Sequence, residues 1–325
     1  MGAIEIVQTL VSPTEKLIDA ISSAIGKAYE PKHVRQMADA KAYELKLIAE
    51  TVRSNSDVPI VYNSNGVAID TSNFEEIAKR ASSRLAYQEI AKQQNIEAVA
   101  DYAYDELGCL DTVSNEPVNP DWMFRFFNSV ENISDVEMQK LWGRILAGEI
   151  RTPNTYSYRT LEKLKNMTQK EAQIFQKIAA MALENEGIYF LFENSEILKR
   201  YGIHFVHLLK MQECGLIEVS TVSLTLTGSL ENADYIANSK VIALFYGQNK
   251  DPQKETINVY LFTESGAQLI KGLSIPSNEQ YIIDCVNSIC EVKSKFRITA
   301  HHINCIREDK SINYDPNDIL SSMEI

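Results

Sequence analysis

The segment that decides the fold runs from Ser134 to Phe175 and reads SDVEMQKLWGRILAGEIRTPNTYSYRTLEKLKNMTQKEAQIF. Its large apolar residues recur at the spacing of one helical face: Met138, Leu141, Trp142, Ile145 and Leu146. Gly148 and the Thr152-Pro153 pair predict the end of this helix and a turn after it. A second helix is expected to open at Thr168, because Thr168 followed by Glu171 has the order of a capping box.

This block is similar to the core of a bacterial domain-of-unknown-function family, numbered 2806, and to the related block of the abortive infection alpha family. The likeness extends upstream to PTEKLIDAISSAIGKAYEP (13–31) and VNPDWMFRFFNSVENIS (118–134). The first family has no assigned activity, so the resemblance implies no catalytic, cofactor-binding or metal-binding residue. The likeness to the second family implies a role in phage defence, although the sequence departs from that family after Phe175.

Length and charge narrow the class of protein. The chain has 325 residues, which at roughly 150 residues per domain indicates about two domains, and 45% of it is apolar. It carries 32 basic and 44 acidic residues, a net charge of -12. Both halves are acidic, with 18 basic against 24 acidic residues up to Met167 and 14 against 20 after it. Such a chain repels nucleic acid phosphates unless its basic residues gather on one face.

Cysteine usage and hydropathy indicate the compartment. The five cysteines stand apart, with no Cys-x-x-Cys pair among them: Cys109, Cys214, Cys285, Cys290 and Cys305. No secretory leader is recognised, so reduced thiols in the cytoplasm are expected. No uninterrupted apolar stretch reaches about 18 residues, so no membrane span is expected.

The first 53 residues are expected to form two amphipathic helices, Pro13–Tyr29 and Lys32–Arg53. The polar face of the first is mixed rather than basic, which favours packing on another helix over lying on a membrane surface. A flexible loop is expected over residues 54–72, where Pro59 and an Asn65-Gly66 turn signal occur.

A long helix is expected over residues 73–108. Neither Gly nor Pro occurs between Asn73 and Leu107, and Gly108 stands as the stop, so one helix of about 50 Å is predicted. Its apolar positions are sparse and rich in alanine: Phe74, Ile77, Ala78, Ala81, Leu85, Ile90, Ile96, Val99 and Leu107. This composition suits helix–helix contact in a hairpin or between copies. A homo-oligomer is therefore expected.

A compact helical core block is expected over residues 118–167. Helix starts are marked by Asn119 before Pro120 and by a capping-box order at Ser134–Glu137. Trp122 and Trp142 lie on the two helices that these signals open. Core packing is the favoured role for both tryptophans, with base stacking or ligand contact as the alternative.

Residues 168–325 follow the element order of a winged helix. The expected helices are Glu171–Leu183, Asn194–Tyr201 and Phe205–Cys214, and strands are expected within Leu216–Leu226 and Val241–Phe262. A closing helix within Tyr260–Leu273, a helix over Ser277–Val292 and a strand over Phe296–Ile306 complete this part. The expected fold is thus mainly α with a smaller α+β part: an N-terminal helical hairpin or coiled-coil-like region, a central helical bundle and a C-terminal winged-helix-like domain.

A winged helix that reads DNA presents positive charge on its third helix. Here that helix carries one lysine, Lys210, together with the polar residues His204 and His207, and the negative charge of Glu213 offsets that of the lysine. His204, His207 and Lys210 are the candidate DNA contacts, yet a single lysine favours a protein-binding use of the same fold.

Signals for chemistry are weak. His301, His302 and Cys305, with Cys285 and Cys290 nearby in sequence, could suggest zinc, but alternation along a strand places the two histidines on opposite faces. Asp284 followed by Glu291-Val292-Lys293 resembles a nuclease carboxylate-x-lysine pair, and so does the helical Glu44-Leu45-Lys46. Known nucleophile, phosphate-binding and dinucleotide motifs are absent from the sequence. No catalytic, cofactor or metal residue is therefore assigned.

The leading hypothesis is a non-enzymatic, self-associating interaction protein with an unidentified protein partner, and the resemblance adds a role in phage defence. A winged-helix transcriptional regulator is the alternative. A nuclease or other enzyme is the third.

Overall fold

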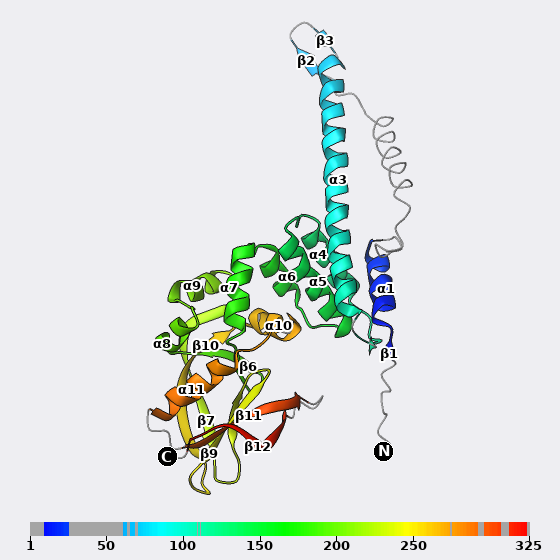
Figure 1. The fold of residues 1–325 in the computed structure, drawn as a ribbon. Helices are drawn as coiled ribbons and strands as arrows, with labels where there is room; N and C mark the ends of the chain where they lie inside the picture. The colour runs from blue at the N-terminus through cyan, green and yellow to red at the C-terminus, as the bar shows by residue number, and fades with distance from the viewer. Residues whose placement is uncertain are drawn as a thin grey trace, which may run out of the picture. The chain divides into compact units, whose positions relative to one another are not determined.

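The computed structural model describes residues 10–25, 61–63, 66–68, 71–108, 110, 112–273, 275–291, 296–306 and 312–323. The chain divides into two compact units, Met1–Asn154 and Thr155–Ile325. These are called unit 1 and unit 2, and Figure 1 shows the elements of each. The expected helix at Lys32–Arg53 and the Glu44-Leu45-Lys46 triple lie outside the described residues.

Unit 1 is helical. Its described helices are α1 (Pro13–Ile25), α3 (Thr71–Leu107), α4 (Pro120–Val130) and α5 (Val136–Arg151). Its described strands are short and pair antiparallel, β1 (Leu10–Val11) with β4 (Val113–Ser114) and β2 (Val61–Asn63) with β3 (Gly66–Ala68). The β2–β3 hairpin lies within the segment that the sequence indicated as a loop.

Aromatic rings fill the core of unit 1. Trp122 stacks on Phe126 with ring centroids 5.1 Å apart, and Phe126 meets Trp142 edge-on at 5.4 Å. Leu17 and Ile21 of α1 are fully buried, so the expectation that this amphipathic helix packs on other helices is confirmed. Trp142 is also fully buried, which places it in the core.

The 37-residue helix α3 matches the expected long helix and has two contrasting sections. Its C-terminal section packs on α5, and its buried residues are Val99, Ala100, Ala103 and Leu107. Gly143 permits this approach, because a Cβ there would lie 2.5 Å from Tyr102 Cβ. Large side chains remain exposed towards the N-terminal end: Ile77, Leu85, Tyr87 and Ile90.

Helix caps account for most of the helix starts. The Asn119 side chain accepts hydrogen bonds from the backbone of Asp121 and Trp122, and Thr168 forms the expected capping box with Glu171. Asp135 caps α5, in place of the expected Ser134. Gly148 does not end α5, which continues to Arg151, because this last turn is buried in the core of the unit.

Unit 2 combines helices with one large sheet. Its described helices are α6 (Tyr158–Lys165), α7 (Gln169–Ala179), α8 (Ser195–Arg200), α9 (Phe205–Glu213), α10 (Glu264–Leu273) and α11 (Glu279–Glu291). Its described strands are β5 (Leu183–Asn185), β6 (Ile188–Phe192), β7 (Ile217–Gly228), β8 (Asp234–Ala237), β9 (Val241–Gly247), β10 (Gln253–Phe262), β11 (Phe296–Ile306) and β12 (Ile312–Met323). They form one eight-stranded antiparallel sheet in the order β12-β11-β9-β8-β5-β6-β10-β7.

The prediction of a mainly α chain with a winged-helix C-terminus is wrong. The described strands of the C-terminal half form one eight-stranded antiparallel sheet, which a winged-helix domain does not contain. The span Val241–Phe262 holds two strands that are not neighbours, since β9 lies between β8 and β11 while β10 lies between β6 and β7. The expected helices at α7, α8 and α9 do form, but β5 and β6 come between the first and the second.

Two of the strand pairs, β5–β6 and β11–β12, are not indicated by the sequence. The β5–β6 hairpin turns through Glu186 and Gly187, whose φ angles of 49° and 87° are those of a tight two-residue hairpin turn. Glu186 is an unusual residue there, so the turn is not evident from sequence. β12 contains Asp315-Pro316-Asn317, residues typical of a turn, and its register with β11 is irregular.

The sheet curls, so that the end of β7 returns to the end of β9. The backbone N–H of Gly247 donates to the carbonyl of Ser229 at 3.0 Å. A Cβ added to Gly228 would lie 2.2 Å from the carbonyl oxygen of Phe245. Only glycine therefore fits this crossing without displacing backbone.

Candidate interaction surface on helix α9

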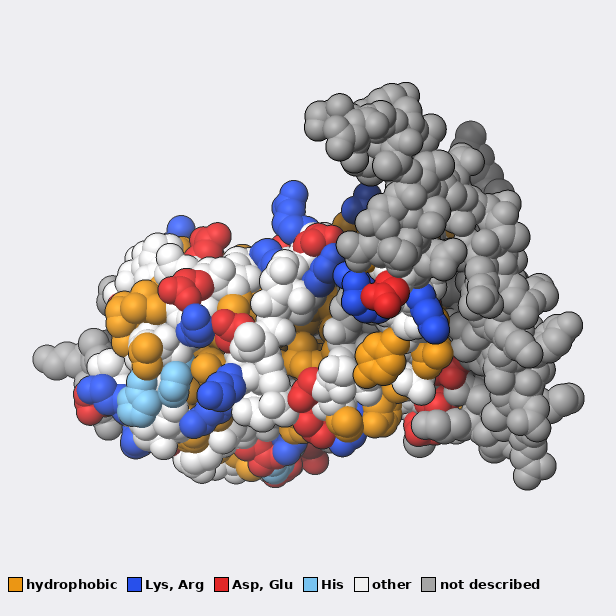
Figure 2. All heavy atoms as spheres, turned by 90° about the horizontal axis from the view of Figure 1, so that it is seen from above, with side chains coloured by type: hydrophobic (Ala, Val, Ile, Leu, Met, Phe, Trp, Pro, Cys, Tyr) orange, Lys and Arg blue, Asp and Glu red, His pale blue; other side chains and the backbone are white. Residues whose placement is uncertain are grey.

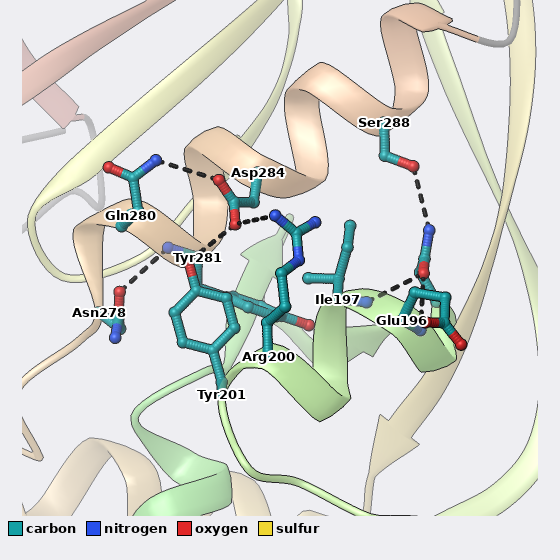
Figure 3. A network of polar contacts seen from close by, with 10 residues as sticks. Glu196, Ile197, Arg200, Tyr201, Asn278, Gln280, Tyr281, Asp284 and Ser288 are labelled. Carbon is teal, nitrogen blue, oxygen red and sulfur yellow. Dashed lines mark hydrogen bonds and ion pairs between the residues drawn. The ribbon is translucent and has the colours of Figure 1, made fainter.

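Helix α8 is anchored to α11 by a polar network centred on Asp284 (Figure 3). One carboxylate oxygen of Asp284 lies 3.0 Å from Nη1 of Arg200 and accepts the hydroxyl of Tyr201 at 3.1 Å. The other oxygen accepts from the Gln280 amide at 3.0 Å. At the start of α8, Asn194 caps the helix and donates to the Ser288 hydroxyl at 3.1 Å.

These contacts hold α8 against α11. Burial, then the hydrogen bond to Asp284, raises the pKa of Tyr201, so its hydroxyl stays protonated and keeps donating. The Tyr201 ring meets the fully buried Tyr281 edge-on at 5.3 Å. All these contacts are internal to the α8–α11 pair. Asp284, considered above as part of a nuclease-like pair, is thus occupied by its neighbours, and Lys293 lies outside the described residues.

The turn after α8 sets the direction of α9. Gly202 has a φ of 66°, a conformation that favours glycine, and its carbonyl accepts the ammonium of Lys177 at 3.0 Å. Ile203 is buried beneath the turn. The chain then enters α9 with His204 at the N-cap position.

A histidine pair caps the start of α9. The backbone N–H of His204 donates to Nδ1 of His207 at 3.2 Å, and the two rings lie 5.5 Å apart. Burial lowers the pKa of His207, with the charges of His204 and Lys177 as smaller causes. A neutral imidazole is the form that can accept this hydrogen bond at Nδ1. The pKa shift and the cap therefore favour the same protonation state.

Helix α9 is anchored on one face and apolar on the other. Leu208 and Met211 are buried, which fixes the inner face on the unit. The outer face exposes Phe205 at 59%, Val206 at 64% and Leu209 at 42%. These three side chains, called the α9 surface below, lie within about one turn of helix and so adjoin one another. Large apolar groups gathered on an exposed face mark contact sites more often than isolated ones do.

Lys210 at the edge of the α9 surface has its charge compensated. Its ammonium lies 3.0 Å from a Glu213 carboxylate oxygen and 3.5 Å from one of Glu171. The hydrogen bond to Glu213 is the main cause of its raised pKa. The structure thus brings His204, His207 and Lys210 together on one helix, but with the lysine engaged and His207 half-buried.

Figure 2 shows histidine, apolar and cationic side chains side by side on this face of the molecule. Sequence reasoning selected the polar members of this group and missed Phe205, Val206 and Leu209. A signal was present, because the run Phe205-Val206-His207-Leu208-Leu209 holds more apolar residues than one helical face can bury.

The histidines and cysteines considered for zinc do not converge. His301 is buried and its Nε2 is 2.9 Å from the Thr299 hydroxyl, while His302 Nδ1 is 2.7 Å from Asp318. Cys285 is buried on α11, whereas Cys305 is exposed. Within the described ranges, no three His, Cys, Asp or Glu side chains are grouped to hold a metal ion.

A cavity of about 360 Å³ in unit 1 lies between α1 and the segment that leads into α4. Lys16 lies at its wall and donates to the carbonyl of Ile150 at 2.8 Å, near the C-terminus of α5. Burial lowers the pKa of Lys16, while Glu116 and Glu149 act in the opposite direction. A lysine at a helix C-terminus stabilises the last carbonyls, so Lys16 has a structural role there.

In the part of the chain that the structure describes, no helix combines the length and apolar character needed to cross a membrane.

A family model described as a protein of unknown function (DUF2806) matches residues 79–285. This match supports the first of the two resemblances noted from the sequence; the likeness to the abortive infection alpha family is not shown by it. No curated protein and no solved structure matches the chain.

Proposed function

The chain belongs to the DUF2806 family of proteins of unknown function. From the apolar side chains that α9 exposes, we propose that it is an interaction protein that docks a partner protein on α9. Its role on this proposal is binding rather than catalysis. A part in phage defence, implied only by the second resemblance, stays a prediction.

One observation carries the proposal: α9 keeps Phe205, Val206 and Leu209 outside while Leu208 and Met211 hold its inner face. An aromatic and two aliphatic side chains on a fixed helix suit the desolvated centre of a protein–protein contact. A partner that covers them gains hydrophobic free energy at little cost in ordering the helix, because Leu208 and Met211 already hold α9 on the unit, where it contacts α7 and β7.

DNA binding has less support. The lysine at the edge of α9 is paired with Glu213 and Glu171, and duplex binding depends on free cations that meet phosphates. An apolar helix face gains nothing from the phosphate backbone.

Loss of the apolar side chains is expected to abolish docking. Replacing Phe205→Ser together with Leu209→Ser in the tagged full-length chain should reduce recovery of at least one co-purifying protein by roughly 10-fold or more, the scale of a lost hot spot. The measurement is quantitative mass spectrometry after mild cross-linking in the native cells. Ile188→Ser with Leu230→Ser is the matched control, since these side chains are exposed in the same unit at 47% and 52%.

Equal recovery in both double variants would remove the α9 surface as the docking site. Fluorescence anisotropy with a labelled random duplex tests the alternative directly. Duplex binding that weakens steeply with salt and disappears in Lys210→Glu would replace docking by DNA binding; no change in anisotropy is expected.

Self-association through α3 is the second part of the proposal. The exposed section carries Ile77 at 51%, Leu85 at 48% and Tyr87 at 75% exposure, apolar area that contact with a second copy would cover. The amphipathic helix α1 gives no argument for an oligomer, because it packs within its own chain. Among the described helices of unit 1, the support comes from α3.

Light scattering at micromolar concentration is expected to give a mass that is a multiple of 36.7 kDa. Leu85→Glu with Ile77→Glu should shift the mass towards one chain, while Arg84→Glu with Lys79→Glu, at exposed positions on the same helix, serves as a charge-changing control. A mass of 36.7 kDa for the unaltered chain at every concentration would contradict self-association.

A further inference from the structure

The helices around the α9 surface carry the opposite charge to the chain as a whole. The chain has a net charge of -12. Helices α7, α8 and α9 together hold five Lys and Arg residues against three Glu residues. With Asp284 of α11, which pairs with Arg200, the count is five basic against four acidic residues, so this region is slightly positive in a chain that is acidic as a whole.

Several of these cations are already paired. Lys199 lies 2.9 Å from Glu196, Arg200 lies 3.0 Å from Asp284, and Lys210 is held as described above. Their charges are largely compensated within the unit.

The lysines of α7 differ. Lys170 and Lys177 are exposed, and neither forms an ion pair with a carboxylate among the described residues. They stand seven positions apart, which places them on the same face of the helix. The Lys177 ammonium reaches the Gly202 carbonyl at the entry to α9, and Glu171 beside Lys170 reaches Lys210 on α9. Lys177 thus lies at the entry to α9, where its ammonium meets a carbonyl but no carboxylate of the described residues. Lys170 lies two turns away on the same face of α7, next to the residue that reaches Lys210 on α9.

Apolar groups and free cations have different effects in such a contact. Burial of large side chains supplies most of the affinity. Rim charges add little energy each, about 0.2 to 1 kcal/mol, but they select the sign of the partner and speed association. Lys170 and Lys177 would repel a basic segment, and a neutral segment would form no ion pair with them.

We propose that the partner docks through an acidic segment that places apolar side chains on Phe205, Val206 and Leu209 and carboxylates beside Lys170 and Lys177. This inference rests on the proposed docking function and adds the chemistry of the occupant.

The test first captures the occupant. The full-length chain with p-benzoylphenylalanine at Val206 is irradiated in its native cells, and the attached peptide is identified by mass spectrometry. The expected peptide carries net negative charge and at least two large apolar residues. It is then synthesised with a fluorescent label and titrated with the full-length chain by anisotropy.

Reversal of the two charges is expected to weaken binding of this peptide. Lys170→Glu with Lys177→Glu should raise its Kd by roughly 10-fold or more, and the Kd for the unaltered chain should rise between low and moderate salt. Lys250→Glu with Lys254→Glu makes the same change in net charge on exposed residues of the same unit and should leave the Kd almost unchanged.

The acidic chemistry of the partner and the docking on α9 fail by different results. A neutral or basic captured peptide, a second copy of this chain as the main product, or a Kd unaffected by Lys170→Glu with Lys177→Glu would each overturn the acidic partner and leave docking on α9 in place. Failure to capture any protein through position 206 would overturn the docking function and this inference with it.

Discussion

Replacing Trp142 with alanine is expected to destabilise unit 1 by about 3 to 5 kcal/mol, because a large buried aromatic side chain is lost and a cavity is left. Trp142 is fully buried and meets Phe126 at 5.4 Å between ring centroids, so its removal leaves an apolar cavity that water does not fill. Since most single domains are stable by about 5 to 15 kcal/mol, the variant should be partly or wholly unfolded. Urea denaturation followed by circular dichroism measures the loss.

Phe124→Ala is the control for this prediction. It also removes an aromatic side chain, from α4, but Phe124 is 61% exposed, so the expected loss is small. A Trp142→Ala chain that keeps its stability but loses its partner would show that Trp142 is a contact residue rather than a core residue.

Replacing Gly228 with alanine is expected to cost about 3 kcal/mol, at the upper end of what forced overpacking usually costs. The added Cβ would lie 2.2 Å from the carbonyl oxygen of Phe245, and backbone cannot move aside as a flexible side chain can. Relief would require β7 to separate from β9, which opens the curl of the sheet. Thermal unfolding of the full-length chain measures the change as a lower Tm.

Gly108→Ala is the matched substitution for Gly228→Ala. Its Cβ would meet only ordinary contacts, the nearest at 3.5 Å, so its Tm should stay close to that of the unaltered chain. If Gly228→Ala and Gly108→Ala unfold at the same temperature, the close crossing of β7 and β9 does not hold the sheet in its curled form.

Much of the helical structure could be predicted from sequence, because its signals are local. Asn119 before Pro120 and Thr168 before Glu171 satisfy backbone N–H groups within a few residues, so the residue order alone is informative. The limits of α3 followed from the absence of Gly and Pro before Gly108. Gly148 was misleading, since burial kept α5 helical past it.

The sheet could not be predicted in the same way. Strand order depends on pairings between distant segments, as where β8 pairs with β9 on one side and with β5 on the other. Short strands such as β5 carry too few residues for a period-two pattern to be recognised. Two long strand regions beside three helices therefore matched a winged-helix order, although their actual neighbours are different strands.

The candidate surface was predicted in part for a related reason. Residue types alone pointed to His204, His207 and Lys210, whose chemistry is visible in the sequence. Whether Phe205 and Val206 face the core or solvent depends on how α9 packs on the rest of unit 2, which no local pattern states. The same packing gave Lys210 its partner Glu171 on α7 and so removed a free cation.

Docking on α9 requires that a partner covers the α9 surface inside cells, and cysteine labelling measures this occupancy. Val206→Cys is labelled with a membrane-permeant maleimide in intact native cells and in the purified chain, and modification at position 206 is quantified by mass spectrometry. Ile188→Cys is labelled in parallel as an exposed site outside the surface. If a partner covers the α9 surface, position 206 should react at least several-fold more slowly in cells than in the purified chain, while position 188 should react at similar rates in both. Equal reactivity of position 206 in both settings would contradict a partner docked on α9.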